Sequence, residues 1–196
     1  MILPIHAYGD PVLRRKAADI DPSYDGLEQL IADMLETMHS ASGIGLAAPQ
    51  IGKSIRLFVM DTETALKHLE EDKEDENPFK GETGIKRIII NARAVNKNGS
   101  PFEYNEGCLS IPKIREDVVR PSEITLEYVD ENFKPHKETF KGLAGRVAQH
   151  EYDHIDGVLF VDYLKPLKKR LIKKRLENIS KGEVEVDYKM KFPLKK

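Results

Sequence analysis

The sequence lacks the features of a secreted, disulfide-stabilised or membrane-embedded protein. It contains a single cysteine, Cys108, so no disulfide can form within the chain. Residues 1–15 contain no apolar run of the roughly 7–15 residues that a signal peptide requires. Nowhere does the chain reach the roughly 18 consecutive apolar residues that are typical of a membrane-spanning helix. These absences predict a cytoplasmic protein with no membrane partner.

An excess of charge of one sign is also absent. The chain has 31 basic and 33 acidic residues and a formal net charge of -2, which gives no overall field for attracting nucleic acid or an anionic membrane. We therefore expect any partner to be recognised locally. A length of 196 residues suits one hydrophobic core. We expect a single domain over residues 1–196, and we expect it to be a monomer.

The most informative pattern that is present is H-E-Y-D-H, which runs from His150 to His154. Residues four apart lie on one face of a helix, so these two histidines can bind a single metal ion. Glu151 directly follows the first histidine, where its carboxylate can take a proton from a metal-bound water and return it to a leaving group. Gly157 supplies a stop of the kind that follows a helix. The pattern predicts a metallohydrolase.

The spacing of apolar residues predicts an α+β fold, in which mixed or antiparallel strands pack around this metal-binding helix. Residues 25–40 have helical spacing, which predicts a core-facing helix whose methionines are core residues and not ligands. A short helix is expected over residues 11–17, because Asp10-Pro11 matches an N-cap followed by proline. Alternation and turn residues predict strands over 55–60, 87–91, 102–104, 111–119, 124–129, 136–140, 158–161 and 184–188.

Three peripheral segments differ in composition from the rest of the chain. Residues 61–86 include a crowded acidic run over 70–76 that is followed by Asn77-Pro78, which predicts a solvated insertion loop. Residues 166–179 predict a basic helix, and residues 183–196 form a C-terminal extension.

The basic helix also carries apolar residues, which predict a stripe that docks on the core and leaves the charges in water. The stripe consists of Leu167, Leu171, Ile172 and Leu176. A run of charge commonly serves solubility alone. We nevertheless expect weak, salt-sensitive contact with the ribosome, because a local basic face attracts RNA even on a chain without net positive charge. The residues expected to make this contact are Lys169, Arg170, Lys173 and Lys174.

A catalytic metal of this kind usually has three protein ligands and one open position, so a third ligand is needed. Cys108 lies between two predicted strands, and a thiolate with two imidazoles suits zinc or ferrous iron. A lone cysteine is also commonly a small buried hydrophobe, although the flanking Glu106 and Gly107 suit the rim of a site better than a core strand. The rival ligand is Glu177, which would indicate a zinc peptidase. Phe160 excludes the class that completes H-E-x-x-H with a third histidine.

Three segments together resemble the ordered motifs of the peptide deformylase family. They are G-I-G-L-A-A-P-Q at residues 43–50, E-G-C-L-S at residues 106–110 and Q-H-E-Y-D-H at residues 149–154. The resemblance implies an enzyme that hydrolyses the N-formyl group of newly made polypeptides that begin with formyl-methionine. The tail after Gly182 and the acidic run over 70–77 have no counterpart that we recognise in the family.

The resemblance also implies a cofactor and a set of reacting groups. Ferrous iron is the usual metal, with zinc or nickel as substitutes, and its ligands here would be Cys108, His150 and His154. The oxygen of the attacked formyl group gains negative charge, so hydrogen-bond donors must already point at it. The resemblance assigns this task to the side-chain amide of Gln50 and the backbone N–H of Leu109.

Other residues near the motifs are expected to contact the substrate. Ile44 and Gly45 can present backbone groups to an extended peptide by strand addition, with Glu106 and Gly107 on the opposite side. Arg146 lies on the same helix face as the two histidines, so it either borders the pocket for the first side chain or is an exposed cation.

Ligating histidines commonly need further support, and Arg120 and Asp153 are expected to pair as a brace for them. Two other functions remain open from the residues alone. A peptide-binding or ribosome-associated module with a closed structural zinc site would not need Glu151. An endopeptidase would cleave internal amide bonds and would be indifferent to a formyl group.

Overall fold

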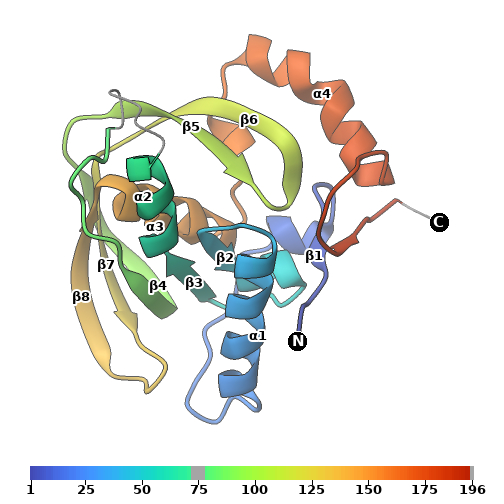
Figure 1. Ribbon diagram of the computed structural model, residues 1–196. Coiled ribbons are helices and arrows are strands. Elements are labelled where there is room, and N and C mark those ends of the chain that lie inside the picture. The colour runs from blue at the N-terminus through green and yellow to red at the C-terminus, as the bar shows by residue number, and fades with distance from the viewer. Residues whose placement is uncertain (72–77, 195–196) are drawn as a thin grey trace.

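The computed structural model, which describes residues 1–71 and 78–194, has the predicted α+β fold, built around one central helix (Figure 1). This helix, α3 (Gly142–Ile155), packs against a five-stranded sheet. Its apolar residues Leu143, Val147, Ala148 and Ile155 are buried in one cluster with side chains of the sheet. The helix that was predicted to carry the metal ligands is therefore held rigidly by the core.

Each strand of the sheet runs antiparallel to its neighbours. Every residue of β3 (Leu57–Asp61) is buried, because the sheet is covered on both faces. Phe58 and Met60 pack in the cluster that contains α3, whereas Leu57 and Val59 pack with α1 (Leu27–Ser40), as the two-residue period of a strand requires. The strand order is β2 (Gly45–Ala47), β3, β4 (Lys86–Asn98), β7 (Glu123–Val129) and β8 (Pro135–Lys141).

The predicted helix over residues 25–40 is α1, and its two inner methionines are confirmed as core residues. Met34 and Met38 are fully buried. The predicted short helix near residue 11 is a 3-10 turn, η1 (Pro11–Arg14), which Asp10 caps by accepting a hydrogen bond from the Val12 N–H. In the described part of the chain, no helix combines the length and the apolar composition that crossing a membrane would require.

A long hairpin of β5 (Phe102–Cys108) and β6 (Ile111–Arg120) forms a separate two-stranded sheet. Its register pairs Gly107 with Arg115 and, after a shift, Cys108 with Ile111. Leu109 and Ser110 therefore form the tight turn at the hairpin's end. This arrangement places Cys108 at the last position of a strand, where its backbone is fixed on one side by the turn and on the other by the ladder.

The predicted insertion loop over residues 61–86 is wrong in part. Asp61 ends β3, and α2 (Glu63–Glu71) follows it directly, with its first turn capped by the Asp61 carboxylate that accepts from the Glu63 N–H. Leu66 is buried on the inner side of this helix. The rest of the acidic run, residues 72–77, lies outside the described residues.

The predicted strand over residues 158–161 is also wrong. Leu159, Phe160 and Val161 are all buried, and the chain forms a 3-10 turn, η3 (Phe160–Tyr163), in place of a strand. The Asp162 carboxylate accepts a hydrogen bond from the Leu159 N–H, which closes the turn. A run that is buried on all sides does not distinguish a strand from a turn by its periodicity.

The basic helix is α4 (Pro166–Lys181), and its predicted docking stripe is wrong in part. Ile172 and Leu176 are buried against the core, but Leu167 and Leu171 are 66% and 67% exposed. The apolar packing of the helix therefore begins at Ile172. Its first turns contact the rest of the protein through lysines, where Lys168 pairs with Glu116 and Lys169 donates to the Asp162 carbonyl.

The chain after α4 crosses back toward the N-terminal segment (Figure 1). The predicted strand over residues 184–188 is wrong, because these residues do not pair with any described strand. The strand in this region is β9 (Met190–Lys191), which pairs parallel with β1 (Ile5–His6). The alternation itself is present in the burial of the side chains: Val184, Val186, Tyr188 and Met190 are half-buried, and the residues between them are exposed. The segment thus lies against the core and has no neighbouring strand, among the described residues, along most of its length.

Candidate active site

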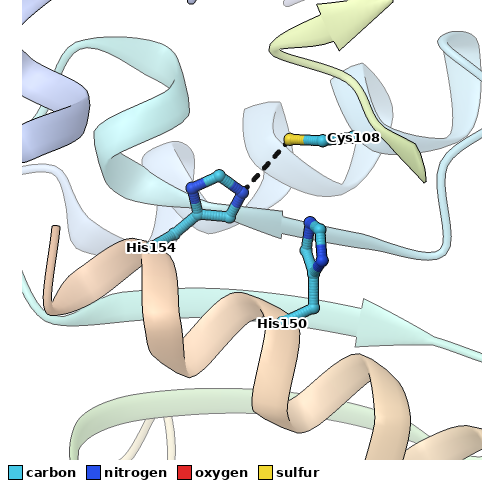
Figure 2. A group of neighbouring side chains, drawn as sticks. All are labelled: Cys108, His150 and His154. Atoms are coloured by element: carbon cyan, nitrogen blue, oxygen red, sulfur yellow. Dashed lines mark hydrogen bonds between the residues drawn. The ribbon is translucent and has the colours of Figure 1, made fainter. Parts of the chain in front are cut away.

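Helix α3 and the β5–β6 hairpin bring together the three predicted metal ligands (Figure 2). His150 and His154 project from one face of α3, and Cys108 faces them from the end of β5. The Cys108 sulfur lies 3.3 Å from Nε2 of His154, and one donor atom from each of the three residues lies within 4.8 Å of the others. The arrangement has the compactness that a single metal ion needs.

The chemistry of the donors fits a divalent metal. Nδ1 of His150 lies 3.1 Å from a carboxylate oxygen of Glu106, which leaves Nε2 of the same ring for the site. A thiolate and two imidazoles are the ligand types that suit zinc and ferrous iron. The rival ligand Glu177 is exposed on α4, and among the described residues it does not belong to this group. The structure therefore favours Cys108.

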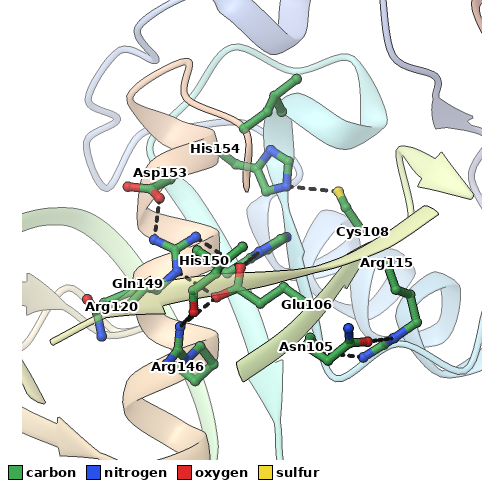
Figure 3. Close-up of polar contacts among 12 residues, drawn as sticks. Asn105, Glu106, Cys108, Arg115, Arg120, Arg146, Gln149, His150, Asp153 and His154 are labelled. Carbon is green, nitrogen blue, oxygen red and sulfur yellow. Dashed lines mark hydrogen bonds and ion pairs between the residues drawn. The ribbon is translucent and has the colours of Figure 1, made fainter. Parts of the chain in front are cut away.

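Glu106 connects the ligands to the surrounding charged residues (Figure 3). Its side chain is 4% exposed, and its two oxygens accept hydrogen bonds from Arg120 at 2.7 and 3.0 Å and from Arg146 at 2.9 Å. Burial opposes ionisation, but hydrogen bonds from His150 and Arg120 hold the pKa of Glu106 well below its usual range. The carboxylate is thus an anion that orients the His150 ring, a role that the sequence interpretation as a substrate-binding residue did not include.

The structure brings the predicted brace together. Arg120 donates a hydrogen bond to Asp153 at 2.6 Å, and both side chains are almost fully buried. The Arg120 guanidinium also stacks on the Tyr163 ring at 4.5 Å. Because Asp153 and His154 are neighbours on α3 and Arg120 also binds Glu106, one arginine ties the helix to the hairpin at the level of the ligands.

Glu151 lies at the site and forms no ion pair within 4 Å among the described residues. Its side chain is buried, and among the described residues Oε2 has no hydrogen-bond partner. Burial raises the pKa of Glu151 to about 7, against the opposing effect of His150. A carboxylate in this state can exchange a proton near neutral pH.

The side chain of Gln50 is held in place with its amide nitrogen directed toward Cys108. It lies in η2 (Ala48–Ile51), the 3-10 turn after β2, and is 1% exposed. Its Oε1 accepts a hydrogen bond from the Ala47 N–H at 2.8 Å, and this bond fixes the direction in which Nε2 points. Nε2 lies 3.4 Å from the Ser110 hydroxyl and 3.6 Å from the Cys108 sulfur.

A cavity of about 460 Å³ is lined by Cys108, His150, Glu151 and Gln50. Ile44 and Gly45 lie on its β2 side, and Gly107 and Leu109 lie on its hairpin side, so the residues predicted to contact substrate surround one space. Arg146 lines the cavity but is 3% exposed, which excludes the alternative of an exposed cation. Its guanidinium donates to the carbonyls of Val118 and Phe102 and lies over the Phe102 ring.

The sequence interpretation missed one part of the cavity wall. Val186, Asp187 and Tyr188 line it from the C-terminal segment, and the Tyr188 hydroxyl donates a hydrogen bond to the Leu109 carbonyl at 2.8 Å. The alternating pattern over 184–188 was visible in the sequence. Nothing in that pattern shows which distant residues the extended segment will cover.

Comparisons with known proteins agree on one family. The model described as polypeptide deformylase matches residues 2–170. Peptide deformylases of Christiangramia forsetii and Flavobacterium johnsoniae are 52% and 53% identical to the chain, each over 98% of it and over 97% and 96% of their own lengths. The fold is similar to that of a Legionella pneumophila peptide deformylase, with a TM-score of 0.76, 36% identity and coverage of 93% and 98% of the two chains. It is also similar to a Synechococcus elongatus peptide deformylase in complex with actinonin, with a TM-score of 0.74, 38% identity and coverage of 88% and 87%.

Proposed function

The chain belongs to the peptide deformylase family, whose enzymes remove the formyl group from formyl-methionine at the start of new polypeptides, and we propose the residues by which it does so. In this proposal Cys108, His150 and His154 hold one metal ion, and Glu151 is the general base and acid. The observation that carries the proposal is the buried Glu151 carboxylate, which lies beside the three ligands with an oxygen that has no partner among the described residues.

The proposed metal is ferrous iron, with zinc or nickel as substitutes. The mixed sulfur and nitrogen donors support any of these three ions, and the family resemblance favours iron. When bound, such an ion supplies a Lewis acid and makes water nucleophilic near neutral pH. The negative charge of Glu106 at Nδ1 of His150 supports this ring as a neutral ligand of fixed orientation.

Glu151 moves the proton in the proposed reaction. It accepts a proton from the attacking water and delivers it to the methionine nitrogen, because an amine leaves poorly unless it is protonated. Its pKa of about 7 supports both halves of this task, since the group is then readily protonated and deprotonated at neutral pH.

Gln50 and Leu109 are the proposed donors to the formyl oxygen. The amide of Gln50 is fixed by its bond to the Ala47 N–H, so it needs little rearrangement as negative charge develops on that oxygen. The Leu109 N–H lies at the hairpin turn directly after Cys108, which supports a donor on the other side of the reacting group.

The substrate peptide is proposed to lie along the cavity in an extended form. The backbone of Ile44 and Gly45 offers hydrogen bonds from the β2 side, with Gly107 across the cavity. Formyl is the smallest acyl group, and the tight contact between Gly45 and Glu151 supports exclusion of an acetyl group at the same place.

We also propose a weak contact with the ribosome through the basic face of α4. Lys169, Arg170, Lys173 and Lys174 are all exposed. The exposure of Leu167 and Leu171 beside them supports a contact surface with both apolar and charged parts. A cytoplasmic location and a monomeric state stay predictions.

The test is a substrate comparison on protein purified without oxygen, with bound metal measured on the same sample. We expect hydrolysis of formyl-Met-Ala, no hydrolysis of acetyl-Met-Ala and no cleavage of internal peptide bonds. Full metal with no hydrolysis of either peptide would indicate a structural metal site. Cleavage of internal bonds would indicate an endopeptidase.

A further inference from the structure

The C-terminal segment of the chain contributes a wall to the substrate cavity. The family model matches residues 2–170, so the segment after α4 lies outside the part of the chain that it describes. Val186, Asp187 and Tyr188 nevertheless line the cavity together with residues of β2 and the β5–β6 hairpin. Residues distant in sequence from all three family motifs therefore meet the space in which the substrate is proposed to lie.

Hydrogen bonds fix this segment at both ends. At its start, Gly182 ends α4 in the left-handed conformation, and the Glu183 N–H donates to the Asn178 carbonyl at 2.9 Å. At its end, the carbonyls of Lys189 and Lys191 accept hydrogen bonds at 2.9 Å from the N–H groups of Ile5 in β1 and of Ala7, which directly follows it. A segment that is held at both ends has little freedom to swing away from the cavity.

Tyr188 makes the contact through which the segment reaches the reacting groups. Its hydroxyl donates to the Leu109 carbonyl at 2.8 Å, and its ring is half-buried in the same cluster as the Leu109 side chain. On another side, Leu109 is in close contact with Gly43, two residues before β2, because a β-carbon added at Gly43 would lie 2.8 Å from its Cδ1. Leu109 is thus held between Gly43 and Tyr188.

The position of Leu109 matters because its N–H belongs to the peptide that joins it to Cys108. A hydrogen bond at the Leu109 carbonyl limits rotation at this residue, and so limits the directions in which its N–H can point. We propose that Tyr188 is a positioning residue for deformylation, which holds the Leu109 N–H toward the formyl oxygen, and that residues 186–188 form the outer wall of the substrate cavity. The inference rests on the proposed role of Leu109.

The first test is Tyr188→Phe, which keeps the ring and removes the hydroxyl. A hydrogen bond worth about 0.5–1.5 kcal/mol corresponds to an effect of about 2- to 12-fold. We expect kcat to fall within this range while KM changes less than twofold, with metal content and melting temperature unchanged. Exchange of the Leu109 amide hydrogen with solvent should become faster. Glu185→Ala is the matched control, because this residue is exposed on the same segment and does not line the cavity; it should change none of these quantities.

The wall itself is tested by Tyr188→Ala, which opens the cavity. We expect KM for formyl-Met-Ala to rise at least threefold in addition to the loss in kcat. Wild-type kcat and wild-type exchange in Tyr188→Phe would overturn the positioning role, and an unchanged KM in Tyr188→Ala would overturn the wall. Failure of the proposed function is distinguishable, because the unmodified enzyme would then not hydrolyse the peptide, whereas amide exchange would still report on the Tyr188 contact.

Discussion

Gly45 and Glu151 are packed so closely that position 45 has no room for a side chain. A β-carbon there would overlap Oε1 of Glu151 and lie 2.8 Å from its Cδ. Glu151 is itself buried, so its side chain can move away from a β-carbon at position 45 only by leaving its place beside the proposed metal ligands. The glycine in β2 therefore sets the position of the carboxylate on α3.

Gly45→Ala should lower kcat by about 10-fold or more, because displacement of a catalytic group by about 1 Å can cost about 100-fold. Metal content should stay at the wild-type level. The matched comparison is the same substitution in a Glu151→Gln background, where it should have little further effect, since the carboxylate it would displace is already absent. Equal losses of kcat in both backgrounds would show that Gly45 acts through something other than Glu151.

Gln50→Ala should lower kcat by about 10²–10³, the usual result of removing one donor to a developing oxyanion. The side chain contacts both the Ser110 hydroxyl and the Cys108 sulfur, so metal content must be measured on the same sample. A change confined to KM would indicate ordinary substrate binding and would reject the oxyanion role.

Asp61 should make the stability of the protein depend on pH. Its buried carboxylate accepts hydrogen bonds from His39 and from the Glu63 N–H and lies near Lys86. Burial raises its pKa, but these three partners outweigh burial and hold the pKa of Asp61 below its usual value of 3.8. A carboxylate whose pKa is lower in the folded state contributes stability above the unfolded-state pKa and loses it as pH falls through the folded-state pKa.

Asp61→Asn should therefore lower the free energy of unfolding by about 1–3 kcal/mol at pH 7, the range for losing hydrogen bonds to a charged group. The difference in the free energy of unfolding between wild type and variant should shrink below about pH 3.8. Urea unfolding at several pH values measures the loss at pH 7 and its decrease at low pH. Asp25→Asn, at an exposed position before α1, is the control and should change the free energy of unfolding by less than about 0.5 kcal/mol. A constant difference from pH 7 to pH 3 would contradict the assignment.

The ribosome contact can be tested by reversing the charge on α4. Changing its four exposed basic residues to Glu should leave hydrolysis of formyl-Met-Ala unchanged and should reduce co-sedimentation with ribosomes at low salt. These residues are Lys169, Arg170, Lys173 and Lys174.

The control variant changes four exposed lysines outside α4 to Glu, so its net charge equals that of the α4 variant. It should retain most of the co-sedimentation. Equal co-sedimentation by both variants and the wild type would reject the contact. The control positions are Lys16, Lys53, Lys80 and Lys134.

The clustering of the three proposed metal ligands could be predicted because local geometry determines most of their arrangement. Helical periodicity alone puts His150 and His154 on one face. Cys108 was expected between two strands, but the tight hairpin that ends at this residue was not predicted. The brace of Arg120 and Asp153 needed one further assumption, that ligating histidines are supported by charged neighbours.

Other parts of the site depend on contacts that periodicity does not encode. Glu106 lines the cavity, as expected, but the burial of its side chain against Arg120 and Arg146 was not predicted, because it depends on how the hairpin packs onto α3. The path of the tail over Leu109 depends on the pairing of β9 with β1, which are far apart in sequence. The exposure of Leu167 shows that an apolar spacing on a helix does not specify how much of it the core can cover.

The central claim, that Glu151 is the general base at a Cys108–His150–His154 metal site, is tested most directly by Glu151→Gln. The amide preserves shape but cannot accept a proton, so we expect one metal ion per chain and a kcat lowered by about 10²–10⁴. Cys108→Ala, measured in parallel, should lose the metal and the activity together. A Glu151→Gln enzyme that retains its metal and a kcat near that of the wild type would contradict the account.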